Sequence, residues 1–76
     1  MVQSFIKFIQ KSPYKDRLMA IVQDIRDDHL EWYDVRALSG QSNVYRLRSG
    51  QIRFIFKKTP QGNRILRVGN RGDVYK

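Results

Sequence analysis

The chain of 76 residues contains no cysteine and only one histidine. Without cysteine it can form neither disulfides nor thiolate metal sites, which fits a reducing intracellular compartment. No second histidine or acidic cluster accompanies His29 to complete a metal site, so we expect no metal and no cofactor. No apolar run is long enough to span a bilayer, and the N-terminus lacks a signal-peptide layout. The sequence therefore predicts a soluble, cytoplasmic protein that does not enter a membrane.

Acidic residues are scarce in the second half of the chain. Residues 1–38 hold six basic and six acidic side chains, whereas residues 39–76 hold nine basic side chains and a single acid, Asp73. The net charge of +8 therefore comes from the second half alone. A solvated surface would also tolerate such charge, but its concentration in one half favours a polyanionic partner.

The length allows one small domain, which we place over residues 1–76. Apolar residues at helical spacing predict two helices, over 3–11 and 13–28. Between them, Ser12 fits an N-cap, Pro13 a first helical position and Asp16 a capping-box acid. Beyond the second helix, His29 is expected to interact with the helix C-terminus. Trp32 and Tyr33 fit either the core edge or a binding surface, and we expect core.

The second half predicts strands over 43–49, 52–57 and 64–69, because β-branched and aromatic residues alternate there with turn residues. Two helices followed by three strands indicate an α+β fold. In it, an N-terminal helical hairpin packs on an antiparallel sheet of about three strands.

The first two strands form a hairpin with an arginine face. A two-residue loop at 49–50 would set Leu47 opposite Ile52 and Arg46 opposite Arg53. The alternation assigns these residues to the core face: Tyr45, Leu47, Ile52, Phe54 and Phe56. It assigns these to the opposite face: Arg46, Arg48 and Arg53. If Leu66 and Val68 of the third strand point to the core, Arg67 and Arg71 join the arginines.

Arginines that face each other across a sheet cost stability, about 0.2–1 kcal/mol per pair. A single pair splayed into water would need no explanation. Several on one face favour anion binding, because guanidinium forks match phosphate oxygens and keep their charge. A phosphodiester is the expected ligand.

The second half resembles the RelE/ParE superfamily of bacterial type II toxins. The resemblance lies in "ALSGQSNVYRLRSGQIRFIF" and "LRVGNRGDVYK". These segments hold a Leu-x-Gly before the hairpin, a Tyr-basic-x-basic strand, a glycine turn, an arginine in the next strand and a Val-Gly-x-Arg that leads to Val-Tyr. The resemblance covers residues 37–76 and extends as a pattern to the helical pair. Family members usually open with a β-strand, which this chain lacks, and many end with a further helix.

RelE-type members cleave messenger RNA in the ribosomal A site, whereas ParE-type members lack the basic set and poison DNA gyrase. This chain keeps the basic set, so the resemblance implies a metal-independent endoribonuclease (mRNA interferase) and an acidic cognate antitoxin as partner. The implied catalytic residues are Arg46, Arg48, Arg53, Arg71 and Tyr75. Further RNA contacts are expected from Lys57, Lys58, Arg64, Arg67 and Lys76.

The implied reaction is attack of a ribose 2′-hydroxyl on the adjacent phosphate, which leaves a 2′,3′-cyclic phosphate and a 5′-hydroxyl. The arginines would stabilise the phosphorane. Tyr75 would stack on a base, orient the 2′-hydroxyl or simply pack the tail.

Departures from the family pattern leave the general base unassigned. Relatives often have lysine at Arg46 and Arg48 and histidine at Asn70, and arginine does not act as a base. Asp73 and Glu31 are weak candidates. Two rival functions stay open: a gyrase-inhibiting toxin without nuclease activity and a non-catalytic RNA-binding module.

Overall fold

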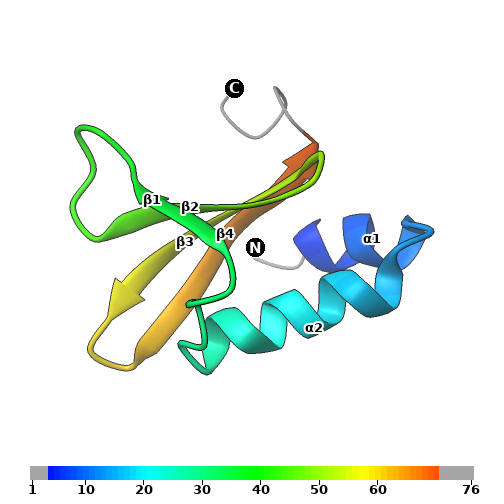
Figure 1. The fold of residues 1–76 in the computed structure, drawn as a ribbon, viewed down its shortest axis with the longest axis horizontal. Coiled ribbons are helices and arrows are strands. Elements are labelled where there is room, and N and C mark those ends of the chain that lie inside the picture. The colour runs from blue at the N-terminus through cyan, green and yellow to red at the C-terminus, as the bar shows by residue number, and fades with distance from the viewer. Residues whose placement is uncertain (1–3, 71–76) are drawn as a thin grey trace.

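The computed structural model describes residues 4–70 as two layers, a helical pair and a four-stranded antiparallel sheet (Figure 1). The elements are α1 (Ser4–Lys11), α2 (Lys15–Arg26), β1 (Asp34–Ala37), β2 (Val44–Ser49), β3 (Ile52–Thr59) and β4 (Gly62–Asn70). The strands lie in the order β1-β2-β3-β4, each antiparallel to its neighbour. The α+β prediction is confirmed, with one strand more than expected.

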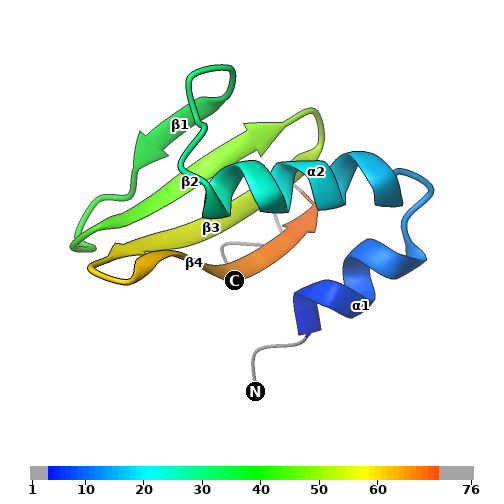
Figure 2. The ribbon, with the colours of Figure 1, turned by 90° about the horizontal axis from the view of Figure 1, so that it is seen from below.

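Both helices lie on the same side of the sheet, where they bury the core (Figure 2). Leu18, Ile21, Val22 and Ile25 recur at helical spacing and form the buried stripe of α2. The core residues that the sheet contributes are Leu47, Phe54, Phe56, Ile65 and Val68. An eight-residue helix such as α1 is marginal alone, so its packing against this core stabilises it.

Helix α2 begins at Lys15, two residues later than predicted. The Ser12 hydroxyl accepts a hydrogen bond from the backbone N–H of Tyr14 at 3.0 Å, so it closes the turn before the helix instead of capping it. At the other end, Asp28 takes a left-handed conformation (φ +59°) that stops the helix. The Asn63 amide of β4 donates to the Ile25 carbonyl at 2.9 Å and ties this end to the sheet.

The segment after α2 was predicted as a connection, and it contains β1. Tyr33 packs against the core as expected, and its hydroxyl donates to Asp24 at 2.5 Å. The expectation that Trp32 is buried is wrong, because its side chain is 86% exposed. Successive residues of an extended chain point in opposite directions. Tyr33 and Val35 pack against the core, so Asp34 between them points away from it. Trp32 lies in the turn before β1, which leaves its side chain in solvent. His29 follows the helix end and is exposed, and its predicted dipole interaction stays a prediction.

The hairpin turn of β2 and β3 differs from its predicted register. Ser49 pairs with Ile52, so the loop is Gly50–Gln51 and Arg48, not Arg46, faces Arg53. Gly50 has a φ of +61° at the first loop position, where a common two-residue hairpin turn requires glycine. The loop lies one residue later in the chain than predicted. Each strand is therefore displaced by one residue relative to the turn, and the same side chains remain on each face. The predicted core and arginine faces of the hairpin are therefore confirmed.

Strand β4 carries a bulge that the sequence did not reveal. The register shifts between Ile55 and Phe56, which pair with Arg67 and Ile65 and leave Leu66 as the extra residue. Leu66 is 48% exposed and Ile65 is buried, so the expectation that Leu66 lies in the core is wrong. Val68 is buried as predicted.

Candidate nucleic-acid interface

The sheet face that points away from the helices holds most of those predicted site residues that lie within residues 4–70. We call it the basic face and define it by the register. Its members are Asp34, Arg36, Val44, Arg46, Arg48, Arg53, Ile55, Lys57, Arg64, Arg67 and Gly69. Neither described helix covers this face (Figure 2). Among its described members Asp34 is the only acid.

Cross-strand pairing arranges these residues in rows. The row nearest the hairpin turn is Asp34–Arg48–Arg53–Gly69, and the next is Arg36–Arg46–Ile55–Arg67. In the third row, Lys57 stands between Val44 and Arg64. Directly opposed side chains have Cβ atoms about 4.5–5.5 Å apart, so neighbouring cations within a row start from closely spaced positions on the sheet.

Arg53 is buried, with only 7% of its surface exposed. Its Nη1 donates to the Gly50 carbonyl at 2.9 Å, which turns the guanidinium toward the hairpin turn. Within residues 4–70, no Asp or Glu forms an ion pair with it. Across the sheet it meets Arg48 on one side and Gly69, which has no side chain, on the other. A buried cation without a carboxylate partner is unfavourable, so this position favours an anionic ligand.

Arg46 and Arg48 differ from Arg53 in having a carboxylate partner. Asp34 lies 3.5 Å from Nη2 of Arg46 and 3.2 Å from Nε of Arg48. The Arg46 side chain is 15% exposed and the Arg48 side chain 52% exposed. Arg48 therefore reaches solvent from the same row that buries Arg53.

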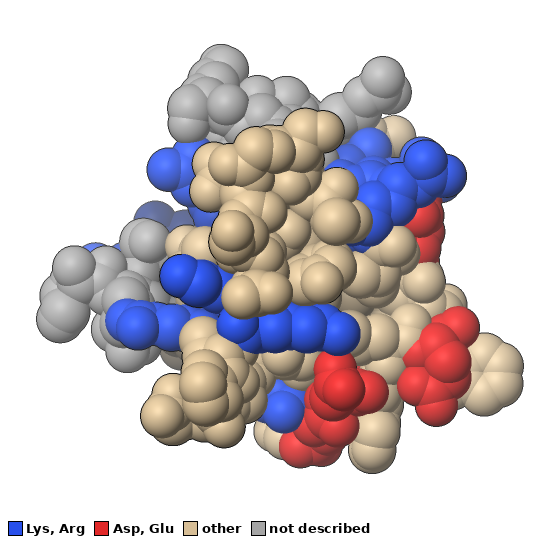
Figure 3. Space-filling view, turned by 90° about the vertical axis from the view of Figure 1, so that its left-hand side faces the viewer, with Lys and Arg blue, Asp and Glu red and all other residues tan. Residues whose placement is uncertain are grey.

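The sheet places most of the described RNA-contact candidates beside Arg46, Arg48 and Arg53. Lys57, Arg64 and Arg67 belong to the basic face. Lys58 belongs to the helix-side face, where its Nζ lies 5.0 Å from the centre of the Tyr45 ring. Three other predicted site residues lie outside the described residues: Arg71, Tyr75 and Lys76. Figure 3 shows Lys and Arg side chains spread over the side that carries the strand connections, with Asp and Glu in the right and lower part of the view.

The basic face also has an apolar part. Val44 and Ile55 are buried there, and Leu38 of the β1–β2 connection packs on them. This apolar part borders the arginine rows, because Ile55 pairs with Arg46. The apolar part is aliphatic and largely covered by Leu38, so the cations are the groups of this face that can contact a nucleic acid.

Asp34 is the site residue that sequence reasoning missed. It escaped notice because β1 was not predicted, and a four-residue strand gives little signal. The alternation was nevertheless present: Tyr33 and Val35 are the apolar members, and Asp34 and Arg36 are the charged ones. Glu31, a candidate base from the sequence, lies exposed in the connection before β1, and Asp73 lies outside the described residues.

Tyr33 fixes the start of β1 and so helps to place Asp34. Burial, followed by the hydrogen bond to Asp24 and the charge of that carboxylate, raises the pKa of Tyr33 to about 12. The tyrosine is therefore neutral and donates to Asp24 throughout the physiological range. Its hydroxyl anchors the connection to α2 one residue before Asp34.

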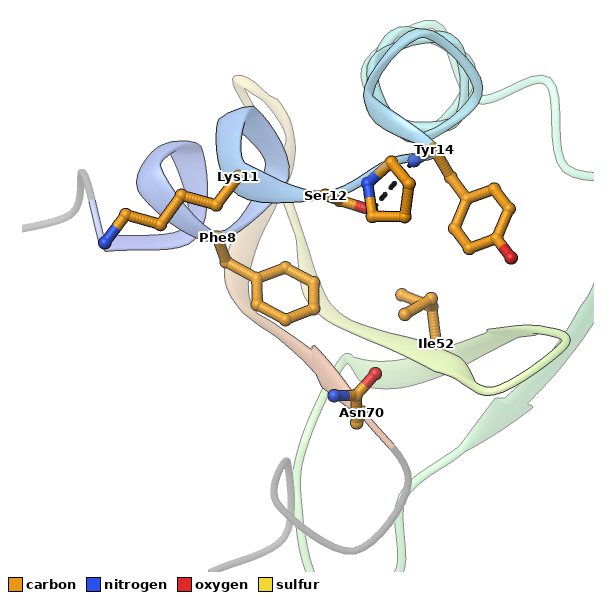
Figure 4. A pocket seen from close by; sticks show the side chains of 7 residues that line it. Phe8, Lys11, Ser12, Tyr14, Ile52 and Asn70 are labelled. Carbon is orange, nitrogen blue, oxygen red and sulfur yellow. Dashed lines mark hydrogen bonds between the residues drawn. The ribbon is translucent and has the colours of Figure 1, made fainter.

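Two shallow cavities lie on the other side of the sheet, between the helical turn and the end of β4. Phe8 and Tyr14 face Ile52 and Asn70 across the first, which has a volume of about 270 Å³ (Figure 4). The second has a similar volume of about 270 Å³ and shares Tyr14, Ile52 and Asn70. Asn70 thus lines a cavity beside the helices, away from the arginine rows.

Comparison with protein families, curated protein sequences and solved structures finds no match for this chain. Within residues 4–70, the metal-ligating side chains do not form a group of three or more. Over the same residues, neither helix has the length and apolarity needed to cross a membrane.

Proposed function

We propose that the protein binds single-stranded RNA on the basic face and cleaves it as an endoribonuclease. The observation that carries the proposal is Arg53, a buried guanidinium without an ion-pair partner among the described carboxylates, set directly opposite Arg48. In a small domain this arrangement costs stability, and a phosphate between the two guanidiniums would offset the cost. The resemblance to RelE-type toxins independently assigns both arginines to the scissile phosphate.

The other cations of the basic face extend the proposed interface along the strands. Arg67 lies one row from Arg53, and Lys57 with Arg64 lies one row further. These side chains would contact phosphates that neighbour the scissile one. Each such contact releases counterions, so RNA affinity should fall with salt by a logarithmic slope of about 0.7 per phosphate.

The proposed reaction needs no metal if charge stabilisation and alignment suffice. The ribose 2′-oxygen forms a bond to phosphorus as the bond from phosphorus to the 5′-oxygen breaks. The 2′-hydroxyl proton passes to a base, and the leaving 5′-oxygen takes up a proton. Arg48 and Arg53 would stabilise the doubly charged phosphorane, which is the larger part of such catalysis. Arg71 and Tyr75 complete the catalytic set implied by the resemblance.

Arginine does not act as the base, because its pKa exceeds about 12. General acid–base help is worth about 10²- to 10⁴-fold, so without it cleavage would be slow or would depend on the ribosome. Binding in the ribosomal A site, as in RelE-type toxins, would supply the alignment of the RNA. We accordingly propose messenger RNA in the A site as the substrate and the cytoplasm as the compartment.

An acidic antitoxin is the proposed protein partner. No described helix covers the basic face, and its cations far outnumber its one described acid. An acidic chain laid across it would neutralise the like charges and compete with RNA. Such a partner would also raise the stability of this small domain by binding only the folded state.

The test is primer extension on a reporter mRNA after brief expression in cells. We would compare the native sequence with Arg48→Ala and Arg71→Ala, and with Lys11→Ala on the helical layer as the matched control. New 5′ ends inside the coding region, lost in the two arginine variants and kept in the control, would support the proposal.

Two other outcomes would contradict it. Growth arrest with intact mRNA would favour gyrase inhibition, which should survive both arginine substitutions. Salt-sensitive RNA binding without cleavage or arrest would identify a non-catalytic RNA-binding module.

A further inference from the structure

Three guanidinium groups surround the Asp34 carboxylate. Its Oδ1 lies 3.5 Å from Nε of Arg36 and 3.5 Å from Nη2 of Arg46, and its Oδ2 lies 3.2 Å from Nε of Arg48. The register explains the convergence, because β1 sets Asp34 opposite Arg48 and Arg36 opposite Arg46. Both carboxylate oxygens therefore point into the arginine cluster of the basic face.

These contacts are long. Strong charge-assisted hydrogen bonds measure about 2.7–2.9 Å and often pair two nitrogens with two oxygens. The separations between the arginine nitrogens and the Asp34 oxygens given above are 3.2–3.5 Å. The Asp34 side chain is 33% exposed, so water also weakens the pairs. The arrangement orders the guanidiniums without holding them tightly.

A phosphate group would satisfy the same nitrogens better. It has the same sign of charge as the carboxylate and more acceptor oxygens, and it can be reached by the two-nitrogen forks of the arginines. Arg53 has no carboxylate partner among residues 4–70. Arg46 and Arg48 can bind a phosphate fully only after they leave Asp34.

We propose that Asp34 is an internal counter-anion that holds Arg46 and Arg48 in the free protein and competes with RNA phosphate for them. The inference rests on the proposed RNA binding at the basic face and adds a residue that tunes it. Asp34 keeps the like charges of the face compatible with folding. In return it lowers the affinity for RNA, because binding must break two existing ion pairs.

The test measures binding of a 2′-O-methyl uridine oligonucleotide, which cannot be cleaved, by fluorescence anisotropy at fixed salt. Asp34→Asn keeps the shape of the side chain and removes its charge, so it should tighten binding about threefold to tenfold. The matched control is Asp27→Asn, which makes the same charge change on an exposed residue at the end of α2. The control should change the affinity by less than about twofold, because exposed charges beyond a Debye length are screened.

A second background separates competition from general charge. In Arg48→Gln protein, Asp34 has lost its nearest partner, so adding Asp34→Asn should tighten binding clearly less than it does in the native background. Equal tightening in both backgrounds would overturn the proposal. So would unchanged affinity with a slower cleavage of unmodified RNA, because Asp34 would then be acting on the reaction and not as a competitor.

Failure of the proposed function gives a different result. If no variant binds the oligonucleotide, the same variants are titrated with inorganic polyphosphate. Tighter polyphosphate binding by Asp34→Asn alone would keep the counter-anion role and reject RNA as the ligand. RNA binding that is equal in the native protein and Asp34→Asn would reject the counter-anion role and leave the proposed function intact.

Discussion

Replacing Arg53 by methionine should stabilise the protein while it removes RNA cleavage. Arg53 is 7% exposed, faces Arg48 across the ladder and has no carboxylate partner among residues 4–70. Methionine has a flexible, unbranched apolar side chain that can fill the same space. The substitution therefore removes a buried charge and leaves the packing largely intact.

The contacts of Arg53 set the expected size of the effect. The hydrogen bond to the Gly50 carbonyl contributes about 0.5–1.5 kcal/mol, but Gly50 is exposed and water can replace the donor. Loss of the repulsion from Arg48 contributes about 0.2–1 kcal/mol in the other direction. Exchange of a whole buried ion pair for apolar side chains is neutral or stabilising by about 1–4 kcal/mol, and exchange of the single Arg53 charge should act in the same direction. We expect a net gain of about 1 kcal/mol, or about 4–8 °C in Tm.

Thermal unfolding followed by circular dichroism measures this gain, and the primer-extension assay measures cleavage. Arg36→Met is the matched control, since Arg36 belongs to the same face but is mostly exposed and should change stability by less than about 0.5 kcal/mol. Single-stranded RNA should raise the Tm of the native protein more than that of Arg53→Met. A loss of more than about 1 kcal/mol in Arg53→Met would refute the reasoning, because Arg53 would then stabilise the fold without a ligand.

Four further substitutions test the packing behind the site. Ile65→Ala should lower the free energy of unfolding by about 2–4 kcal/mol and Leu66→Ala by less than about 1 kcal/mol, and chemical denaturation showing equal losses would contradict the bulge. Asn63→Ala should cost about 1–2 kcal/mol in the same assay, because the end of α2 loses its amide donor. Because the pKa of Tyr33 is raised from 10 to about 12 in the folded state, its neutral form adds stability that is present below pH 10 and lost as the pH rises toward 12. Tyr33→Phe should lack this alkaline loss of stability. A phenolate absorbance titration should show that the tyrosine with the highest pKa is missing from the variant, and its persistence there would contradict the assignment to Tyr33.

The sequence predicted the layers of the fold because its periodic patterns are strong. The apolar stripe of α2 and the alternation of β2 and β3 each follow one period over at least six residues. The faces of the hairpin were predicted even though the loop was misplaced by one residue. Parity decides the face, and a shift of both strands preserves it.

The wrong predictions concern features that depend on contacts between segments, which the pattern within one segment does not reveal. The four-residue strand β1 depends on pairing with β2 and is too short for a clear pattern. The bulge at Leu66 is set by the register against β3, which periodicity within β4 does not report. Trp32 was expected in the core because it is large and apolar, but its neighbour Tyr33 takes the inward position.

For the candidate site, the residue types were predictable and their electrostatic partners were not. The arginine face followed from alternation alone. The pairing of Arg46 and Arg48 with Asp34 depends on β1, and the burial of Arg53 depends on the assembled sheet. These two features separate an arginine that already has a counter-anion from one that has none among the described residues.

The most direct test of the account is a ¹⁵N–¹H correlation spectrum recorded during titration with uncleavable single-stranded RNA. We expect the largest shifts on the side-chain Nε–H groups of Arg48 and Arg53 and on backbone amides of β2, β3 and β4. Helix α2 should show little change. Shifts concentrated on the helical layer, or no shifts at RNA concentrations well above that of the protein, would contradict the claim that the basic face binds RNA.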